Sequence, residues 1–319
     1  MNFLEEAEKL KINCRENELL KNYTTFKIGG PAKYFAVAKS REDLINLIKL
    51  ARQHKISFFL LGGGSNILFS DQGFKGLVIK NEHQEIKIED ETIEVSSGYS
   101  LTDLLSQSIK HNLTGLEFTA GIPGTIGGAV VGNAGAYGKA ISDLLIKIEV
   151  LDSNDEIKNL NKEDLNFSYR HSSLKENNDL LLKIYLKLNK GDTEQSLKEI
   201  NKIIQDRNSK HPQEPSAGSI FKNVIITPEI INNLKKKNVP IPDKFYEFKK
   251  IPAGFLIEYL DLKGKKIGEA QISVKHGNYL INLGNAKAEE IIQLISFIKQ
   301  QVRDKLSIQL EEEVRYIGF

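Results

Sequence analysis

The sequence predicts an α+β protein of about two domains. Its 319 residues allow roughly 150 residues per domain, and 40% of them are hydrophobic, which is enough to bury a substantial core without disulfides. Strand-like and helix-like segments alternate up to about residue 208. The proline-containing stretch at residues 209–216 then interrupts the pattern and indicates a domain junction.

The composition argues against several classes of function. The 44 Lys and Arg residues nearly balance the 42 Asp and Glu, so the formal net charge of +2 provides no general attraction for nucleic acid or for an anionic membrane. Cys14 is the single cysteine, which excludes an intramolecular disulfide and a multi-cysteine zinc site and fits a reducing compartment. We therefore expect a cytoplasmic protein with no metal site and no evident obligate protein partner.

The hydrophobic segments do not indicate a membrane protein. The N-terminal residues MNFLEEAEKLK carry acids where a signal peptide would have a basic start and an apolar core. The longest uncharged stretch lies between Glu117 and Lys139, but it is rich in glycine and contains Pro123 and Asn133. We expect loops and short elements there rather than a membrane span.

The first elements predict a β-α-β start. Ser40 and Asp43 have the spacing of a capping box, and the apolar residues that follow at helical intervals predict a helix to about His54. The apolar and aromatic run at residues 56–61 predicts a buried strand. This run ends at three successive glycines, as expected where a strand opens into a tight turn.

The later elements are predicted from hydrophobic periodicity. Alternating apolar residues on either side of a polar stretch predict a β-hairpin at residues 85–95. Helices are predicted at residues 101–111, 193–208 and 288–305, and strands at residues 144–151, 156–160, 180–188 and 314–317.

The first glycine-rich segment, LGGGSNILFSD at residues 61–71, directly follows a predicted strand. Glycines at this point let backbone amides approach an oxygen-rich anion, because no side chain blocks the route and positive φ is allowed. A pyrophosphate is the natural ligand of such a turn, although an ordinary tight turn between strands would use the same residues. The candidate binding residues are Gly62, Gly63, Gly64, Ser65 and Asn66.

The second glycine-rich segment is GIPGTIGGAVVGNAGAYG at residues 121–138. Its glycines are spaced so that the backbone can pack flat against a planar or phosphorylated ligand, and close packing of a helix against a sheet is the alternative. Two such segments in one α+β region favour a dinucleotide, but their spacing does not decide which one. The candidate binding residues are Gly121, Gly124, Thr125, Gly127 and Gly128.

Neither segment matches the common nucleotide-binding motifs. In the first segment Ile67 stands where a Rossmann GxGxxG would have its third glycine, and the second segment has a different period. A P-loop is excluded because Ala140 and Lys266 follow the two Gly-Lys pairs, so the hydroxyl that would hold magnesium is missing.

Further blocks occur in a fixed order after the glycine-rich segments. They are YRHSS at residues 169–173, PSAGSIFKN at 215–223, IPAGFLIEYLDLKGKKIGEAQISVKHGNYLINLGNA at 251–286 and EEEVRYIG at 311–318. Together with the glycine-rich segments, they resemble the UDP-N-acetylenolpyruvoylglucosamine reductase (MurB) family. The resemblance covers nearly the whole chain, and its motifs are specific in combination.

The resemblance implies a two-lobed FAD-binding domain of the vanillyl-alcohol-oxidase/MurB type plus a C-terminal α+β substrate domain. The expected ranges are 1–80 and 81–208 for the two FAD-binding lobes and 209–319 for the substrate-binding domain, whose final strand is able to pack back on the FAD-binding region. The spacing resembles the shorter class that lacks an extra substrate-closing loop. FAD would be held non-covalently, because Cys14 lies far upstream of both glycine-rich segments and neither segment contains histidine.

The implied reaction is the NADPH-dependent reduction, via FAD, of UDP-N-acetylglucosamine enolpyruvate to UDP-N-acetylmuramate in peptidoglycan precursor synthesis. One alternative is another FAD-dependent oxidase or dehydrogenase of the same fold acting on an alcohol or sugar. A second alternative is a catalytically silent nucleotide-binding or scaffold protein. An alcohol oxidation calls for a base rather than a proton donor, so the three catalytic candidates favour the reductase.

These candidates, matched to the family's catalytic residues, are Arg170, Ser219 and Glu313. Hydride addition to a double bond attached to a carboxylate pushes negative charge into that carboxylate. The planar fork of an arginine binds a carboxylate through two parallel hydrogen bonds and stays charged, which suits Arg170 to this place. A surface or structural ion pair is the alternative for Arg170 taken alone.

Ser219 would supply the proton, and Glu313 would donate a hydrogen bond to the developing aci-carboxylate. A hydroxyl within hydrogen-bond reach can protonate the carbon next to the carboxylate, although Gly218-Ser219 would also suit a turn or a helix cap. Glu313 would have to be protonated part of the time, and desolvation together with the substrate's anion would raise its pKa. A surface acid in the charged run at residues 311–313 is the alternative.

Other residues are weaker candidates. Lys222 and His276 are candidate contacts of the substrate's diphosphate or of the nicotinamide donor. Residues 23–25, followed by Gly29 and Gly30, resemble the family's opening flavin contacts, or form a turn into the first strand.

The chain departs from the family pattern at three positions. Val224 and Glu312 stand where the family often has proline, and Asp261 stands where glycine is usual. We expect these changes to affect local loop geometry more than the chemistry.

Overall fold

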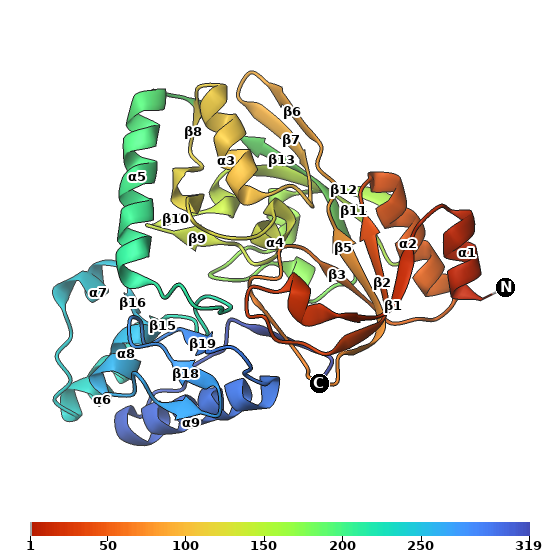
Figure 1. Ribbon diagram of the computed structural model, residues 1–319. Helices are drawn as coiled ribbons and strands as arrows, with labels where there is room; N and C mark the ends of the chain where they lie inside the picture. Colours follow the sequence, from red (N-terminus) through yellow and green to blue (C-terminus); the bar gives the residue numbers. More distant parts are fainter. Residues whose placement is uncertain (1) are drawn as a thin grey trace. The chain divides into compact units, whose positions relative to one another are not determined.

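The computed structural model describes residues 2–319, and the chain divides into two compact units (Figure 1). Unit 1 contains the described residues up to Glu18 together with Ala32–Gly63 and Lys75–Arg207. Unit 2 contains Leu19–Pro31, Gly64–Phe74 and Asn208–Phe319. Two early segments of the chain therefore belong with the C-terminal residues. The division into two FAD-binding lobes and a substrate-binding domain stays a prediction.

A four-stranded sheet with two helices forms the first part of unit 1. Its elements are α1 (Phe3–Lys9), β1 (Cys14–Leu19), β2 (Pro31–Ala38), α2 (Arg41–Gln53), β3 (Phe58–Leu61) and β5 (Phe74–Asn81). The strand order is β1-β2-β5-β3, and β3 runs parallel to β5. Helix α2 begins with the predicted capping box, in which the side chains of Ser40 and Asp43 each accept a hydrogen bond from the other residue's amide.

Helix α2 ends with a left-handed residue, which delays the start of the next strand. Lys55 has φ +53°, and the Ile56 amide donates to the Ala51 carbonyl at 2.8 Å. This is the bond pattern of a helix C-terminal cap. The strand predicted to begin at Ile56 therefore begins at Phe58.

A five-stranded antiparallel sheet forms the second part of unit 1. Its strands are β6 (Ile86–Glu89), β7 (Thr92–Ser96), β11 (Leu145–Leu151), β12 (Ile157–Asn161) and β13 (Leu180–Lys187), in the order β12-β11-β13-β7-β6. The predicted hairpin is confirmed, because β6 pairs antiparallel with β7. Across the sheet Ile148, Ile184 and Val95 lie in register, and all three are buried.

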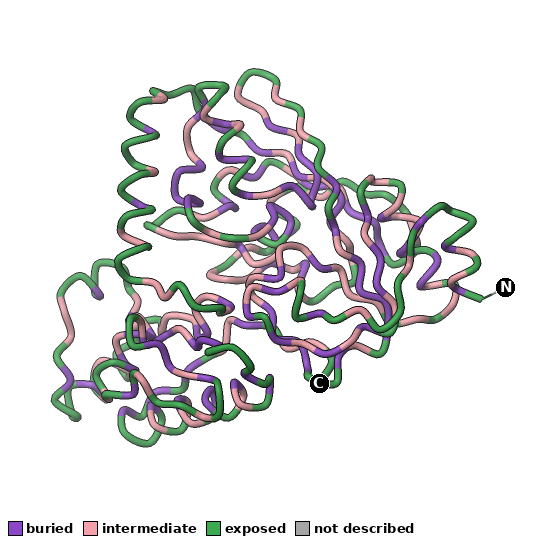
Figure 2. Tube along the Cα trace, viewed as in Figure 1, coloured by how far each residue is buried: buried purple, intermediate pink, exposed green. Residues whose placement is uncertain are grey.

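Helices cover this sheet with apolar faces. They are α3 (Leu101–Lys110), α4 (Ile126–Val131) and α5 (Thr193–Lys210), and their buried residues join one core with those of the strands. Figure 2 shows buried positions along the sheet and mainly exposed positions along α5. Two short strand pairs complete unit 1, namely β8 (Leu113–Thr114) with β14 (Asn189–Lys190) and β9 (Gly135–Ala136) with β10 (Lys139–Ala140).

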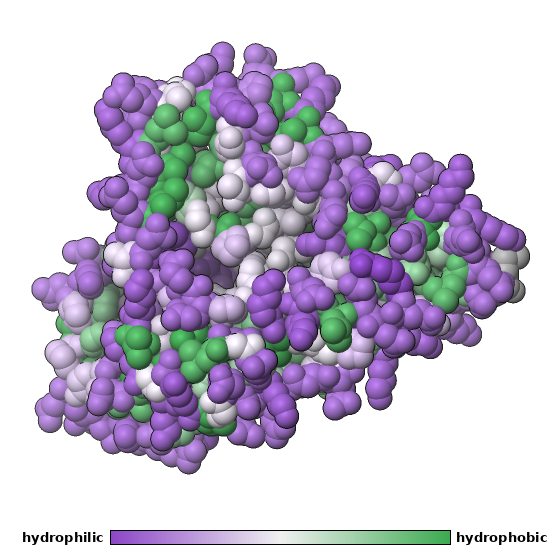
Figure 3. Space-filling view, in the orientation of Figure 1, coloured by the Kyte–Doolittle hydropathy of each residue, from purple (hydrophilic) through white to green (hydrophobic). Residues whose placement is uncertain are grey.

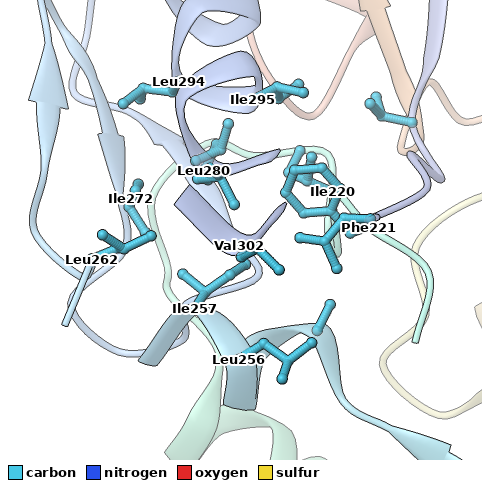
Figure 4. Close-up of a cluster of buried hydrophobic side chains, with 14 of the residues drawn as sticks. Ile220, Phe221, Leu256, Ile257, Leu262, Ile272, Leu280, Leu294, Ile295 and Val302 are labelled. Carbon is cyan, nitrogen blue, oxygen red and sulfur yellow. The ribbon is translucent and has the colours of Figure 1, made fainter. Parts of the chain in front are cut away.

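Unit 2 is built around the long C-terminal helix α9 (Ala288–Leu306). The predicted apolar face of this helix is buried, and Figure 4 shows Leu294, Ile295 and Val302 in one cluster with Ile220 and Phe221. The other elements are α6 (Pro228–Lys236), α7 (Asp243–Glu247), α8 (Ala253–Tyr259), the pair β15 (Val224–Ile225) and β16 (Lys250–Ile251), and the sheet of β17 (Lys266–Ile267), β18 (Ala270–Ile272) and β19 (Leu280–Asn282).

The last strand of the chain pairs with a strand from the first glycine-rich segment. β20 (Arg315–Ile317) runs parallel to β4 (Ile67–Phe69), with Arg315 opposite Ile67. The strand predicted near the C-terminus is therefore confirmed. Its partner explains why Gly64–Phe74 belongs to unit 2.

One face of the molecule is mainly polar. The face in Figure 3 is coloured largely as hydrophilic, with smaller hydrophobic patches. Within residues 2–319 no helix combines the length and the hydropathy needed to cross a membrane.

Candidate active site

The two glycine-rich segments meet inside unit 1. A Cβ placed on Gly63 would lie 2.4 Å from the Gly124 Cα, and one placed on Gly62 would lie 2.6 Å from the Thr125 Oγ1. Neither distance is compatible with a side chain, so the two backbones approach as closely as glycine permits. Segments separated by about sixty residues of sequence thus form one glycine-lined surface.

The second segment enters a short helix at this surface. Thr125 caps α4 by accepting a hydrogen bond from the Gly128 amide at 3.2 Å. Gly121 and Gly124 have φ of +72° and +131°, which non-glycine residues rarely adopt. A Cβ on Gly127 would lie 2.5 Å from the Ser97 carbonyl oxygen. A pyrophosphate fits a surface of this kind, which has bare backbone at close approach and one capped helix start.

The remainder of the first segment packs on the residues predicted to open the flavin site. A Cβ on Gly64 would lie 2.1 Å from the Tyr23 carbonyl oxygen, and the Thr25 amide donates to the Gly64 carbonyl at 3.1 Å. Gly30 is equally constrained, because its Cβ would lie 2.1 Å from the Asp71 carbonyl oxygen. Residues 23–30 are therefore fitted to the glycine-rich segment as well as leading into β2.

Asn66 has a role that its sequence context did not suggest. Its side-chain amide donates to the Glu313 carbonyl at 3.1 Å, and its own carbonyl accepts from the Arg315 amide at 3.1 Å. Asn66 thus ties the glycine-rich segment to the start of β20 and to Glu313, two residues before it. Whether it also contacts the cofactor stays a prediction.

Arg170 lies in unit 1 at the tip of a tight hairpin. Ser168 and His171 exchange two backbone hydrogen bonds, each of 3.1 Å, so Tyr169 and Arg170 are the two central residues of the turn. Arg170 has φ +59°, a conformation in which glycine or asparagine is usual. Strain of this kind persists where the surroundings impose it and is frequent at functional sites.

Contacts on both sides hold this turn in place. The Arg170 Nη1 donates to the Gly135 carbonyl at 2.9 Å, which connects the arginine to the end of the second glycine-rich segment. The Lys175 Nζ donates to the Arg170 carbonyl at 2.7 Å. The backbone that carries the Arg170 guanidinium is therefore held in place next to the predicted cofactor-binding segment.

Ser219 and Glu313 lie in neighbouring extended segments of unit 2 that are joined by isolated β-bridges rather than by longer strands. The Glu313 amide donates to the Ile220 carbonyl at 2.7 Å, and the Lys222 amide donates to the Glu311 carbonyl at 2.8 Å. Ser219 in turn forms an antiparallel bridge with Tyr279. The strand that carries Ser219 thus lies between the segment at residues 276–279 and the segment at residues 311–313.

Asn278 holds the segment that carries Ser219 in place. The sequence alone did not indicate this role of Asn278. Its side-chain oxygen accepts from the Phe221 amide at 3.0 Å, and its side-chain nitrogen donates to the Phe221 carbonyl at 2.9 Å. Its carbonyl accepts from the Ile220 amide at 2.9 Å. Asn278 is buried, and a buried amide with both ends bonded holds its partner strand rigidly. Nothing in the local sequence distinguishes it from a turn asparagine.

His276 is a neutral hydrogen-bond donor in this arrangement. Its Nδ1 accepts from the Asn278 amide at 3.1 Å, so the ring proton is on Nε2. Burial lowers the pKa of His276, and Glu258 opposes this shift only in part. Lys222 pairs with Glu311 at 3.1 Å on the neighbouring strand. Lys222 is three residues from Ser219 along the chain, and His276 is three residues from Tyr279, the bridge partner of Ser219. Their roles in binding stay predictions.

Two of the departures from the family pattern have local explanations. Asp261 has φ +55°, a conformation that glycine adopts freely and aspartate tolerates, so the replacement of the usual glycine is structurally mild. Val224 pairs with Ile251 in the short ladder of β15 and β16, in which a proline is unable to donate.

Comparisons with known proteins agree with this architecture. Residues 32–161 match the family model of a FAD binding domain, and residues 210–317 match that of the C-terminal domain of UDP-N-acetylenolpyruvoylglucosamine reductase. The chain is 40% identical over 319 residues to the reductase of that name from Caldanaerobacter subterraneus subsp. tengcongensis, covering 98% of each chain. It is 40% identical over 308 residues to the one from Clostridium tetani, covering 96% of this chain and 92% of the relative.

A solved structure shows the same fold. The crystal structure of the reductase MurB from Thermus caldophilus superposes with a TM-score of 0.77 at 30% identity, covering 96% of this chain and all of that one. The fold and the matched FAD binding domain define a FAD-dependent oxidoreductase. Within that class, the chain belongs to the UDP-N-acetylenolpyruvoylglucosamine reductase family.

Proposed function

We propose that this chain reduces UDP-N-acetylglucosamine enolpyruvate to UDP-N-acetylmuramate, with electrons from NADPH passed through FAD. The observation that carries the proposal is the pairing of Ile220 with Glu313, because it brings the strand of a candidate proton donor beside the strand of a candidate carboxylic acid. The names of relatives that match over nearly their full length support the same substrate. We also propose that the enzyme works in the cytoplasm and that its product enters peptidoglycan synthesis.

The glycine-lined surface would hold the FAD pyrophosphate. Gly62 and Gly63 leave no room for a Cβ, Gly124 has φ +131°, and Thr125 and Gly128 shape the start of α4. The bound FAD would supply hydride transfer between the nicotinamide donor and the carbon–carbon double bond of the substrate.

Arg170 would bind the carboxylate of the enolpyruvyl group. Negative charge grows on this carboxylate as the hydride adds to the double bond, so a fixed cation stabilises the transition state more than the ground state. The guanidinium matches a carboxylate through two parallel hydrogen bonds, and the constrained turn at Arg170 limits the entropy lost in binding.

Ser219 would protonate the carbon next to that carboxylate, so that hydride and proton together saturate the double bond. Its backbone is fixed through the bridge to Tyr279 and through the bonds that Asn278 makes to the next two residues. Glu313, in its protonated form, would donate a hydrogen bond to the same carboxylate as its charge grows. His276 and Lys222 are proposed contacts of the diphosphate, His276 as a neutral donor and Lys222 as a cation.

Anaerobic stopped-flow absorbance separates the two half-reactions. We expect one equivalent of NADPH to reduce the flavin, and UDP-N-acetylglucosamine enolpyruvate to restore the oxidised flavin band rapidly. In Ser219→Ala, reduction by NADPH should stay within about two-fold of wild type while reoxidation slows by at least ~100-fold. Ser153→Ala, at an exposed turn of unit 1, is the control and should match wild type.

Two results would contradict the proposal. Wild-type flavin that is reduced by NADPH but not reoxidised by the substrate would indicate another acceptor. Equal slowing of both half-reactions in Ser219→Ala would remove the proton-donor role from this serine.

A further inference from the structure

Glu312, next to Glu313, is held by helix α9. Its Oε1 accepts from the Lys299 Nζ at 2.6 Å, and both side chains are about a third exposed or less, at 21% and 32%. The Tyr316 hydroxyl bonds to the same carboxylate. Burial, with this hydrogen bond as the next cause, raises the pKa of Tyr316, which therefore stays a donor. Two donors from two different elements thus fix the direction of the Glu312 side chain.

The strand geometry transmits this direction to Glu313. Glu312 pairs with Phe221, and the flanking hydrogen bonds run from Glu313 to Ile220 and from Lys222 to Glu311. Successive residues of an extended strand point to opposite faces. Because Glu312 faces α9, Glu313 has to project from the other face of the strand.

Glu311 shares that face but has a different environment. Its side chain is 73% exposed and pairs with Lys222. Of the three consecutive glutamates, one is thus directed to α9 and one to the surface. Glu313 is the remaining one, and its carbonyl is held by Asn66.

The pairing of the strands does not depend on the Glu312 side chain or on its amide. The two ladder bonds that flank Glu312 use the amides of Glu313 and Lys222, so the Glu312 amide takes no part in them. The strand register should therefore survive substitution of Glu312. Without the Glu312 contacts, however, the segment should be freer to rotate about its own axis than it is in the wild type.

We propose that Lys299 and Glu312 form a clamp that positions the carboxyl group of Glu313 toward the substrate. The clamp is a pair of positioning residues and touches neither substrate nor cofactor. This inference rests on the proposed function, in which Glu313 is the acid that donates to the substrate carboxylate.

The test compares the two half-reactions in variants of the FAD-loaded enzyme. Glu312→Gln keeps the shape of the side chain and removes its charge. The double variant Lys299→Met with Glu312→Gln removes both charges, so no unpaired charge is left half-buried. Lys299→Arg keeps a cation at the end of the clamp. Asp304→Asn breaks the exposed Arg303–Asp304 pair on the same helix and is the matched control.

We expect the double variant to slow reoxidation by the substrate by about 10- to 100-fold while reduction by NADPH stays within about two-fold of wild type. Lys299→Arg should retain most of the reoxidation rate, and Asp304→Asn should match wild type. Urea unfolding and the flavin absorbance of each variant verify that it is folded and loaded.

Reoxidation within about two-fold of wild type in the folded double variant would overturn the clamp. Equal slowing of both half-reactions, with Lys299→Arg no better than the double variant, would also overturn it and leave a purely structural role. Wild-type flavin that the substrate does not reoxidise would instead refute the proposed function, and with it the role of Glu313 on which the clamp depends.

Discussion

Arg170 offers a stability measurement that separates backbone strain from chemistry. Its φ of +59° costs a residue with a Cβ roughly 1–2 kcal/mol. Glycine avoids this cost, but its freer unfolded chain costs roughly 0.4–1 kcal/mol. We therefore expect Arg170→Gly to be about 1 kcal/mol more stable than Arg170→Ala. Both variants lose the guanidinium and its bond to Gly135, so this loss cancels in the comparison.

The assay has to report on unit 1 itself, because a protein of two units need not unfold in one step. Hydrogen exchange of peptides from β13, followed as urea is raised, supplies this local free energy of unfolding. His171 is the matched control. It is the next residue and is not among the residues with positive φ, so His171→Gly should be less stable than His171→Ala by roughly 0.5–1 kcal/mol.

We expect the glycine variant to be more stable than the alanine variant at residue 170, and less stable than the alanine variant at residue 171. Equal stabilities of the two Arg170 variants, or greater stability of Arg170→Ala, would refute the strain argument. Both variants should also lose at least ~30-fold in the rate of flavin reoxidation by the substrate, as expected when a charged partner is truncated. An active Arg170→Gly would show that the strained conformation serves some other purpose.

Two further predictions concern the cofactor and the core. In Gly63→Ala the new Cβ would lie 2.4 Å from the Gly124 Cα, so we expect FAD to bind at least ~10-fold more weakly in a flavin-fluorescence titration, whereas Gly132→Ala, whose nearest neighbour is 3.4 Å away, should bind normally. Buried Glu117 accepts from Thr114, Ser196 and the Gly115 amide, and although burial alone would raise its pKa, these bonds hold the pKa below its usual value. Glu117→Gln should destabilise unit 1 by about 1–3 kcal/mol at neutral pH, and this difference in urea unfolding should shrink as pH falls below the ordinary glutamate pKa and through the lowered one. A difference that stays constant with pH would mean that the carboxylate charge contributes nothing.

Most of the helices and strands follow from short-range patterns in the sequence. Helix α2 has its capping box and its buried stripe within fourteen residues, and the hairpin of β6 and β7 has its turn between its own strands. Helix α9 likewise has its apolar face at the predicted positions. Such elements need no distant partner to be identified, because capping and periodicity act over one or two turns. The start of β3 was misjudged by two residues, because Lys55 adopts a left-handed conformation after α2.

The identity of the family was also available from the sequence, since its blocks occur in one order along the chain. The placement of the site residues was not. Arg170 could be named, but its strained turn could not be seen, because nothing in YRHSS distinguishes that turn from a surface loop. Asn278 and Asn66 gave no local signal, although both hold the strands of the catalytic candidates.

The sequence by itself determined the class of fold, most of the elements and the residues with suitable chemistry. The tertiary structure decided which segments meet: Gly63 with Gly124, β4 with β20, and Glu312 with Lys299. The physical reason is that helix caps and periodic patterns are local, whereas strand partners and side-chain directions depend on contacts between residues that lie far apart in the chain. For the three glutamates at residues 311–313 the chemistry is identical, and only the register of one strand and the position of one lysine give each of them a different direction.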